Sequence, residues 1–315
     1  MNPINNILVI VDPTAELQPA VAKAAVLATN LGARLELYVC DTKAARESRL
    51  AAHIRRHSNI TGSMNLKSFL EGLAEPLRER GLDVETETDF GASYCERLME
   101  KTKRTTADLV VKDTHHHSLP RRTFLTNTDW RLIRACPLPL LLTKDTTWPA
   151  APKIFAAVDP GHVNDKPALL DKRILQYASV FATQLGGELH VVHAYIPIAV
   201  IASAVGSEPP SALTVSAEEL KVEQEAKVRE VSGAVAEFAV DARRIHVQLG
   251  GPAQLLPHAA RQYHADIMVM GALSRRGLKR AFIGSTAEDV LEYLPCDALI
   301  VKPLDFAEAL QGLCP

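Results

Sequence analysis

Uninterrupted apolar runs and amphipathic segments alternate along the second half of the chain. Apolar runs of this kind are typical of strands in a parallel sheet that helices cover on both faces. They predict strands at residues 154–158, 188–194, 244–249, 266–270 and 298–302. Helical spacing and cap signals predict helices from about 167 to 185, from Ser216 towards Val240, after Pro252 and after Gly284. This alternation predicts a doubly wound α/β fold.

The same pattern occurs twice in the chain. "NNILVIVDP" at 5–13 recurs as "KIFAAVDPG" at 153–161, and "TADLVVKD" at 106–113 recurs as "HADIMVMG" at 264–271. Two further matches follow in the same order, "AAVLATNLGARLELYVC" with "ASVFATQLGGELHVVHA" and "CPLPLLLTK" with "LPCDALIVKP". Such a long internal repeat indicates a duplicated domain. We predict tandem domains at 1–145 and 153–315, joined by a Pro-rich linker at 146–152.

Composition and charge narrow the functional classes. The 315 residues carry a net charge of −2, which argues against non-specific nucleic-acid binding. The five cysteines are scattered without a C-x-x-C pair, which favours a reducing compartment over a disulfide framework. The N-terminus lacks a signal-peptide pattern, and the apolar stretch at 196–205 is far shorter than the ~20 residues of a spanning helix. We expect a cytoplasmic protein with no membrane association.

A glycine-containing basic loop follows the predicted strand at 266–270. In "GALSRRGLKRAFIGSTAEDV", residues 271–290, glycines flank four basic residues and Gly284 opens a predicted helix. Free N–H groups and the helix dipole attract phosphate at such a position. If Gly284 has a positive φ, a side chain there would also strain the turn. Asp159 and Gly271 end strands of the same sheet, so both are expected at the ligand crevice of a doubly wound fold.

This loop resembles the nucleotide motif of the universal stress protein family, Gly-x2-Gly-x9-Gly-Ser/Thr. It reads Gly271-Ala272-Leu273-Ser274, nine residues, then Gly284-Ser285. "AAVDP" at 156–160 and "HVVHAY" at 190–195 also resemble the family, as does the arrangement that includes "TNTDW" at 126–130 and "KDTTWP" at 144–149. The resemblance covers nearly the whole chain as two copies. It implies a five-stranded parallel sheet in each and, in nucleotide-binding members, ATP in the crevice, with the presence of Mg²⁺ left open.

Carried over by position, the nucleoside contacts implied by the family fall on the second domain. Asp159 is expected to contact the nucleotide from the end of the first strand. The backbone of Ala194 is expected at the adenine, and Met270 and Gly271 are expected beside the ribose.

The implied phosphate contacts are Ser274 and the three residues Gly284, Ser285 and Thr286. Ser274 replaces the second glycine of the motif, and serine has less access to positive φ. The loop can therefore differ from that of the family, although the serine hydroxyl is itself able to contact phosphate. Whether the replacement abolishes binding is left open. The alternative is a turn retained only for packing, and we favour binding because the other motif positions are intact.

The first half lacks these features. Residues 112–117, "KDTHHH", align with the start of the loop, and Thr126-Asn127 stand where glycine and serine would be. Asp12 is retained at the end of its strand. We expect that the first domain does not bind a nucleotide.

Other chemistry finds little support. His115, His116 and His117 are ligand types that suit a metal, but adjacent histidines point in different directions, so an exposed loop is favoured. His258 and His264 are expected at the surface. Neither a Walker A motif nor a nucleophile elbow is present, so no catalytic residue is assigned and binding or slow hydrolysis is favoured over rapid turnover.

Two classes of function remain open. The first is a stress-response protein in which ATP in the second domain changes the conformation that unidentified protein partners contact. The second is a nucleotide-independent scaffold or carrier of a small apolar ligand, for which the apolar segment at 196–215 is the candidate element.

The last strand of each domain also needs a partner. The runs at 138–143 and 298–302 are apolar edges. The family resemblance implies that they pair antiparallel in an intrachain pseudo-dimer, with a further homodimer left open.

Overall fold

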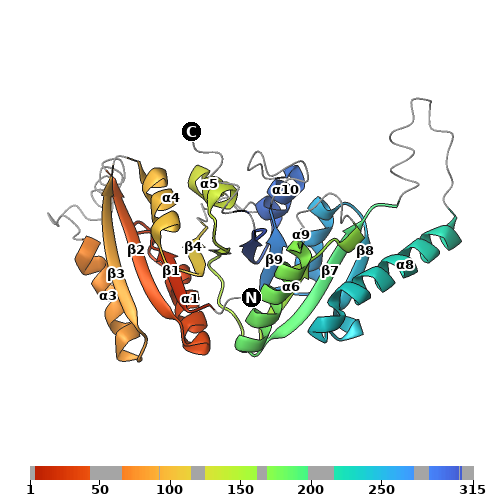
Figure 1. The fold of residues 1–315 in the computed structure, drawn as a ribbon, viewed down its shortest axis with the longest axis horizontal. Coiled ribbons are helices and arrows are strands. Elements are labelled where there is room, and N and C mark those ends of the chain that lie inside the picture. The colour runs from red at the N-terminus through yellow and green to blue at the C-terminus, as the bar shows by residue number, and fades with distance from the viewer. Residues whose placement is uncertain are drawn as a thin grey trace. The chain divides into compact units, whose positions relative to one another are not determined.

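The computed structural model describes residues 4–42, 66–91, 93–114, 125–161, 169–197, 216–272, 284–304 and 306. These residues form two compact units, 4–148 and 149–306. In each unit helices pack on a parallel β-sheet (Figure 1). None of the described helices combines the length and the apolar character needed to cross a membrane.

The described part of the first unit contains a sheet with the order β3-β2-β1-β4-β5. All its pairings are parallel. The strands are β1 (Asn6–Ile10), β2 (Arg34–Thr42), β3 (Val84–Gly91), β4 (Leu109–Asp113) and β5 (Leu140–Thr143). The helices are α1 (Pro19–Leu31), α3 (Leu66–Glu79), α4 (Tyr94–Arg104) and α5 (Asn127–Ala135).

The described part of the second unit repeats this topology, with the order β10-β9-β6-β7-β8 and only parallel pairings. The strands are β6 (Lys153–Ala157), β7 (Glu188–Tyr195), β8 (Ile245–Leu249), β9 (Ile267–Gly271) and β10 (Asp297–Val301). The helices are α6 (Leu170–Gln184), α8 (Ala217–Val235), α9 (Pro252–Gln262) and α10 (Ser285–Tyr293), with 3-10 turns η2 (Ala236–Phe238) and η3 (Ala242–Arg244).

Both units are doubly wound, as the sequence predicted. In the first unit the chain moves outward from β1 to β3 and then returns past β1 to β4 and β5. Because crossovers between parallel strands are right-handed, α1 and α3 cover one face while α4 and α5 cover the other. The second unit places α6 and α8 opposite α9 and α10 by the same rule. Strand order reverses between β1 and β4, and between β6 and β9.

Helix α8 begins as predicted but ends early. Ser216 Oγ accepts a hydrogen bond from the Glu219 amide at 3.2 Å, and the Glu219 carboxylate accepts one from the Ser216 amide at 2.8 Å. This capping box fixes the start of the helix. The predicted extension towards Val240 is wrong, because η2 follows Val235 and Ala239 adopts a left-handed φ of 49°.

A cluster of four rings lies in the second unit, contributed by β6, β7, β8 and the C-terminal end of α9. Phe155 stacks on His190 with centroids 4.6 Å apart, and Tyr263 stacks on His246 at 4.1 Å. The two imidazole rings are nearly parallel, with an angle of 6° between their planes, and His190 Nδ1 is 3.0 Å from His246 Nε2. The histidines are therefore hydrogen-bonded edge to edge between aromatic neighbours.

Candidate functional site

The carboxyl ends of β6, β7 and β9 bring several expected residues to one edge of the second unit's sheet. The β6–β7 register, continued past Ala157, sets Asp159 beside Ala194. Met270 and Gly271 end β9, the strand on the other side of β6. This is the point where strand order reverses, and doubly wound sheets bind ligands there.

Helix α10 starts at the same edge. The Gly284 amide donates to the carbonyl oxygen of Ala272 at 3.3 Å, so the start of α10 lies next to the end of β9. Gly284 makes no side-chain capping bond, and Ser285 and Thr286 in the first turn are exposed. The first N–H groups of a helix have no partner within the helix, so an uncapped and exposed first turn offers donors to an anion.

The two glycines at this edge, Gly271 and Gly284, have different structural surroundings. Gly284 has φ −69° and ψ 140°, an extended conformation that any residue adopts, so the condition of a positive φ is not met. A Cβ on Gly271 would lie 2.9 Å from Leu170 Cδ2, so this glycine makes room for the start of α6. The packing of α6 therefore accounts for Gly271 without a ligand.

Asp159 is held in place from two directions. Its amide donates to both carboxylate oxygens of Asp171, in the first turn of α6, at 3.3 Å each. Its own Oδ1 lies 3.8 Å from Nδ1 of His193, which in turn is 3.0 Å from the Val158 carbonyl oxygen. Burial lowers the pKa of His193, against the opposing effects of Val158 and Asp159, so the ring is neutral near pH 7.

The neutral His193 must donate its Nδ1 proton to Val158, because a carbonyl oxygen only accepts. This leaves Nε2 as a buried acceptor with no hydrogen-bond partner among the described residues. Sequence reasoning missed this histidine, although an imidazole inside the apolar run "HVVHAY" signals a buried polar group.

Helix α8 also reaches this edge. Lys227 Nζ donates to the Glu230 carboxylate at 2.9 Å. A Cβ on Gly161 would lie 2.7 Å from Lys227 Nζ, so this ion pair lies against the loop that follows β6. The sequence offered no spacing signal for this contact, since some 66 residues separate Lys227 from Gly161.

Several predicted elements lie outside the described residues. They include Ser274 with the basic residues of its loop, the histidine triplet at 115–117, and all but the first two residues of the apolar segment at 196–215. Within the described ranges, no three histidine, cysteine or acidic side chains are grouped as a metal site. His258 and His264 are exposed, as expected.

The corresponding edge of the first unit is built differently. Helix α5 begins with a complete capping box, in which the Asp129 amide donates to Thr126 Oγ1 at 3.2 Å and Asp129 Oδ2 accepts from the Thr126 amide at 2.7 Å. Asp12 Oδ1 accepts hydrogen bonds from the amide and hydroxyl of Thr14 at 2.8 and 2.7 Å. The start of α5 is thus satisfied by its own side chains, whereas that of α10 is not.

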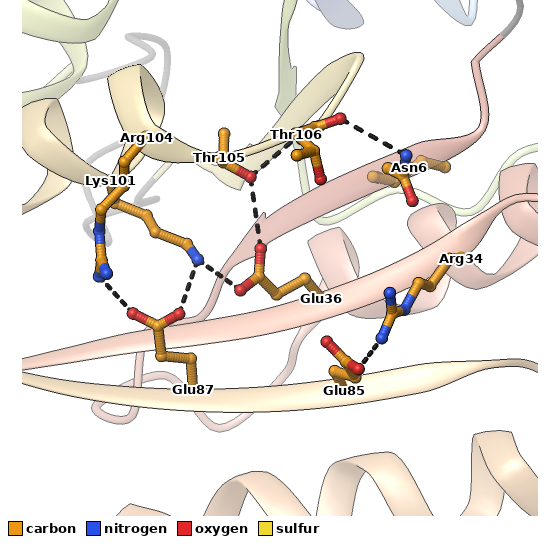
Figure 2. A pocket seen from close by; sticks show the side chains of 11 residues that line it. Asn6, Arg34, Glu36, Glu85, Glu87, Lys101, Arg104, Thr105 and Thr106 are labelled. Carbon is orange, nitrogen blue, oxygen red and sulfur yellow. Dashed lines mark hydrogen bonds and ion pairs between the residues drawn. The ribbon is translucent and has the colours of Figure 1, made fainter.

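A polar cavity of about 290 Å³ lies at the opposite, amino-terminal edge of the first sheet (Figure 2). Lys101 of α4 is ion-paired with Glu36 of β2 and, at 2.7 Å, with Glu87 of β3. Arg104 also pairs with Glu87, and Arg34 pairs with a carboxylate of β3. The charges of this cavity neutralise one another, so it has no set of like charges to attract a charged ligand.

Comparison with known proteins places the fold in a family. Residues 3–144 and 163–302 each match the model of the Universal stress protein family. Universal stress protein E of Salmonella typhi is 27% identical over 309 residues, covering 97% of this chain and 96% of that protein. Its counterpart in Escherichia coli K12 is 27% identical over 301 residues, covering 95% and 94% of the two chains.

Solved structures agree over the whole length. A functionally unknown protein from Pseudomonas aeruginosa PAO1 is similar with a TM-score of 0.75 and 28% identity, covering 98% of this chain and 96% of that one. A putative universal stress protein from Pseudomonas aeruginosa UCBPP-PA14 has a TM-score of 0.74 and 28% identity, covering 98% and 97%. The tandem arrangement inferred from the internal repeat is therefore shared with these proteins.

Proposed function

We propose, from the premise that this chain belongs to the universal stress protein family, that its second unit binds ATP as a regulatory ligand. The ligand would change the conformation that protein partners contact, without rapid turnover. Asp159 and the backbone of Ala194 would hold the nucleoside, with Met270 and Gly271 beside the ribose. Ser274 and the first turn of α10, residues 284–286, would hold the phosphates.

The uncapped start of α10 carries this proposal. Ser285 and Thr286, next to Gly284, offer backbone donors at the sheet edge where Asp159 and Ala194 also lie. The extended conformation of Gly284 does not itself require glycine. A glycine there is instead explained by close approach of a ligand to the backbone, because a side chain would cover the first N–H groups.

Calorimetric titration of the full chain with ATP, with and without Mg²⁺, tests the site. In Gly284→Val a branched side chain covers the N–H groups of the first turn while the backbone conformation stays allowed. Loss of two hydrogen bonds to charged oxygens costs about 3 kcal/mol, which weakens binding about a hundredfold.

The second unit provides a matched control in Gly251→Val. Gly251 is the N-cap of α9 with nearly the same conformation, φ −69° and ψ 133°, and a Cβ there meets nothing within 4 Å. This variant should bind ATP as the wild type does. Equal affinities for the wild type and Gly284→Val would refute the phosphate site.

The second candidate is a nucleotide-independent scaffold or apolar-ligand carrier. It is favoured by the contact of Leu170 with Gly271, which explains one motif glycine by packing alone. Nucleotide released from the purified protein by denaturation separates the two candidates. Absence of bound ATP together with no measurable affinity would favour the scaffold.

A further inference from the structure

The first unit contains charged residues at three positions where the second unit has uncharged ones. The repeats align Lys112 and Asp113 at the end of β4 with Met270 and Gly271 at the end of β9. Helices α5 and α10 both have nine residues. Asp129 is the third residue of α5, and the corresponding third residue of α10 is Ala287. All three charged residues therefore lie at the edge that corresponds to the proposed ATP site.

Lys112 and Asp129 form a buried ion pair at the start of α5. Asp129 Oδ1 lies 2.8 Å from Lys112 Nζ, and the two side chains are 0% and 5% exposed, respectively. Asp129 Oδ2 accepts from the amide and the hydroxyl of Thr126 at 2.7 and 2.8 Å. The carboxylate thus receives N–H donation from a helix start on one oxygen and faces a cation with the other, which is the environment that a phosphate oxygen requires.

The carboxylate of Asp113 accepts a backbone N–H in the same way at the start of α1. Asp113 Oδ1 accepts from the Ala20 amide in the first turn of α1 at 2.6 Å and from Thr143 Oγ1 at 2.7 Å. In the second unit the corresponding position is Gly271, against which α6 packs directly. The starts of α5 and α1 are therefore both bonded to carboxylates of the same unit.

The charge at this edge opposes a further anion. Burial raises the pKa of Tyr94, and the negative charges of Asp12 and Asp129 raise it further, so this part of the unit already experiences negative charge. A phosphate entering here would meet these carboxylates, and the Lys112 ammonium at this edge is already paired with Asp129.

We propose that Asp129 is a built-in substitute for a ligand anion, and that Asp129 and Lys112 are the residues that close the first unit to nucleotides. In the first unit the Asp129 side chain supplies the negative charge that a bound phosphate would otherwise supply, so this edge of the unit is stable without a ligand. This inference concerns the first unit alone and does not depend on ATP binding by the second.

The test replaces the carboxylate and supplies inorganic phosphate. Asp129→Ala introduces the residue that the second unit has at this position and leaves Lys112 without its partner. The chain has two tryptophans, Trp130 and Trp148, and both belong to the first unit. Thermal unfolding of the full chain followed by tryptophan fluorescence therefore reports on the first unit, even if phosphate also binds to the second.

We expect Asp129→Ala to unfold at a lower temperature than the wild type in chloride. Phosphate at matched ionic strength should raise its midpoint by about 2–4 °C or more, the shift that a domain of this size shows for a modest gain in stability. The wild type should show no such rise in tryptophan fluorescence. Asp108→Ala is the matched control, because Asp108 also accepts two backbone N–H bonds, at 2.8 and 3.0 Å, but lies at the other sheet edge.

A double variant keeps the proposal falsifiable if Asp129→Ala folds poorly. Lys112→Met with Asp129→Ala reproduces the uncharged pair of the second unit. The double variant should therefore unfold at a higher temperature than Asp129→Ala, and phosphate should not raise its midpoint. A midpoint for Asp129→Ala that phosphate does not raise, or failure of that variant to fold in phosphate and chloride alike, would overturn the proposal. So would a double variant no more stable than Asp129→Ala. None of these results bears on ATP binding by the second unit, which the calorimetry tests separately.

Discussion

The histidine pair of the second unit should make its stability depend on pH. Burial first, and then the neighbouring His190, lower the pKa of His246 from 6.5 to about 4. Burial also lowers the pKa of His190, against the raising effect of Glu188, while Arg244 and Lys153 add to the lowering. His190 Nε2 lies 3.2 Å from the Glu188 carboxylate, so in the neutral pair it donates there and accepts from His246 at Nδ1.

The direction of the effect follows from proton binding. Between pH 6.5 and about 4 the unfolded chain binds a proton at His246 that the folded chain does not. Stability therefore rises with pH across this window and is lost as the pH falls through it. At about 1.4 kcal/mol per pH unit, the loss from neutral pH to pH 4 is on the order of 3 kcal/mol.

Urea unfolding of the full chain from pH 7 to pH 4 measures this loss. Far-UV circular dichroism follows both units, and tryptophan fluorescence follows the first, so their difference reports on the second. His246→Gln keeps a donor for His190 but does not titrate, so it should remove the part of the second unit's pH dependence that His246 contributes. His258→Gln, at an exposed position, is the control and should behave as the wild type. An equal loss of stability in the wild type and His246→Gln would refute the reasoning.

Other substitutions give sharp contrasts. A Cβ on Gly187 would lie 2.1 Å from the Pro152 carbonyl oxygen, which also accepts from the Glu188 amide, so Gly187→Ala should lower the free energy of unfolding by about 2 kcal/mol or more in urea titration. Gly233→Ala, with open space in α8, should raise it by about 0.5–1 kcal/mol. Lys101→Ala removes the cation shared by Glu36 and Glu87 and leaves Glu87 with Arg104 alone, so it should destabilise the first unit by about 2–4 kcal/mol in fluorescence-monitored unfolding, whereas an unchanged midpoint would contradict the role of this ion pair. The antiparallel pairing of 138–143 with 298–302 remains a prediction, and small-angle scattering that shows two separated bodies would contradict it.

The strands and helix starts could be predicted from the sequence because each depends on residues close together in the chain. The uninterrupted apolar run at 266–270 became β9, and the Ser216-x-x-Glu219 signal became the capping box of α8. The early end of α8 was not predictable, since apolar spacing continues past Val235 while the left-handed turn at Ala239 depends on the surrounding structure.

The site was predictable where it depends on strand order and not where it depends on contacts between distant residues. Sequence reasoning placed Asp159, Gly271 and Gly284 at one edge because doubly wound topology fixes the carboxyl ends of strands. It missed the pair of Lys112 and Asp129, although two signals were present. A lysine in the apolar run "LVVKD" needs a buried partner, and Thr126-x-x-Asp129 is a capping pattern.

The burial of Lys112 with Asp129 also constrains how the two halves can evolve. Replacing either residue alone leaves an unpaired charge in the interior, at a cost of about 3–5 kcal/mol, which is a large share of the 5–15 kcal/mol that stabilises a typical domain. A lineage that carries this pair therefore cannot return to an uncharged crevice through one neutral substitution. The duplicated halves therefore keep different residues at these corresponding positions unless both positions change together.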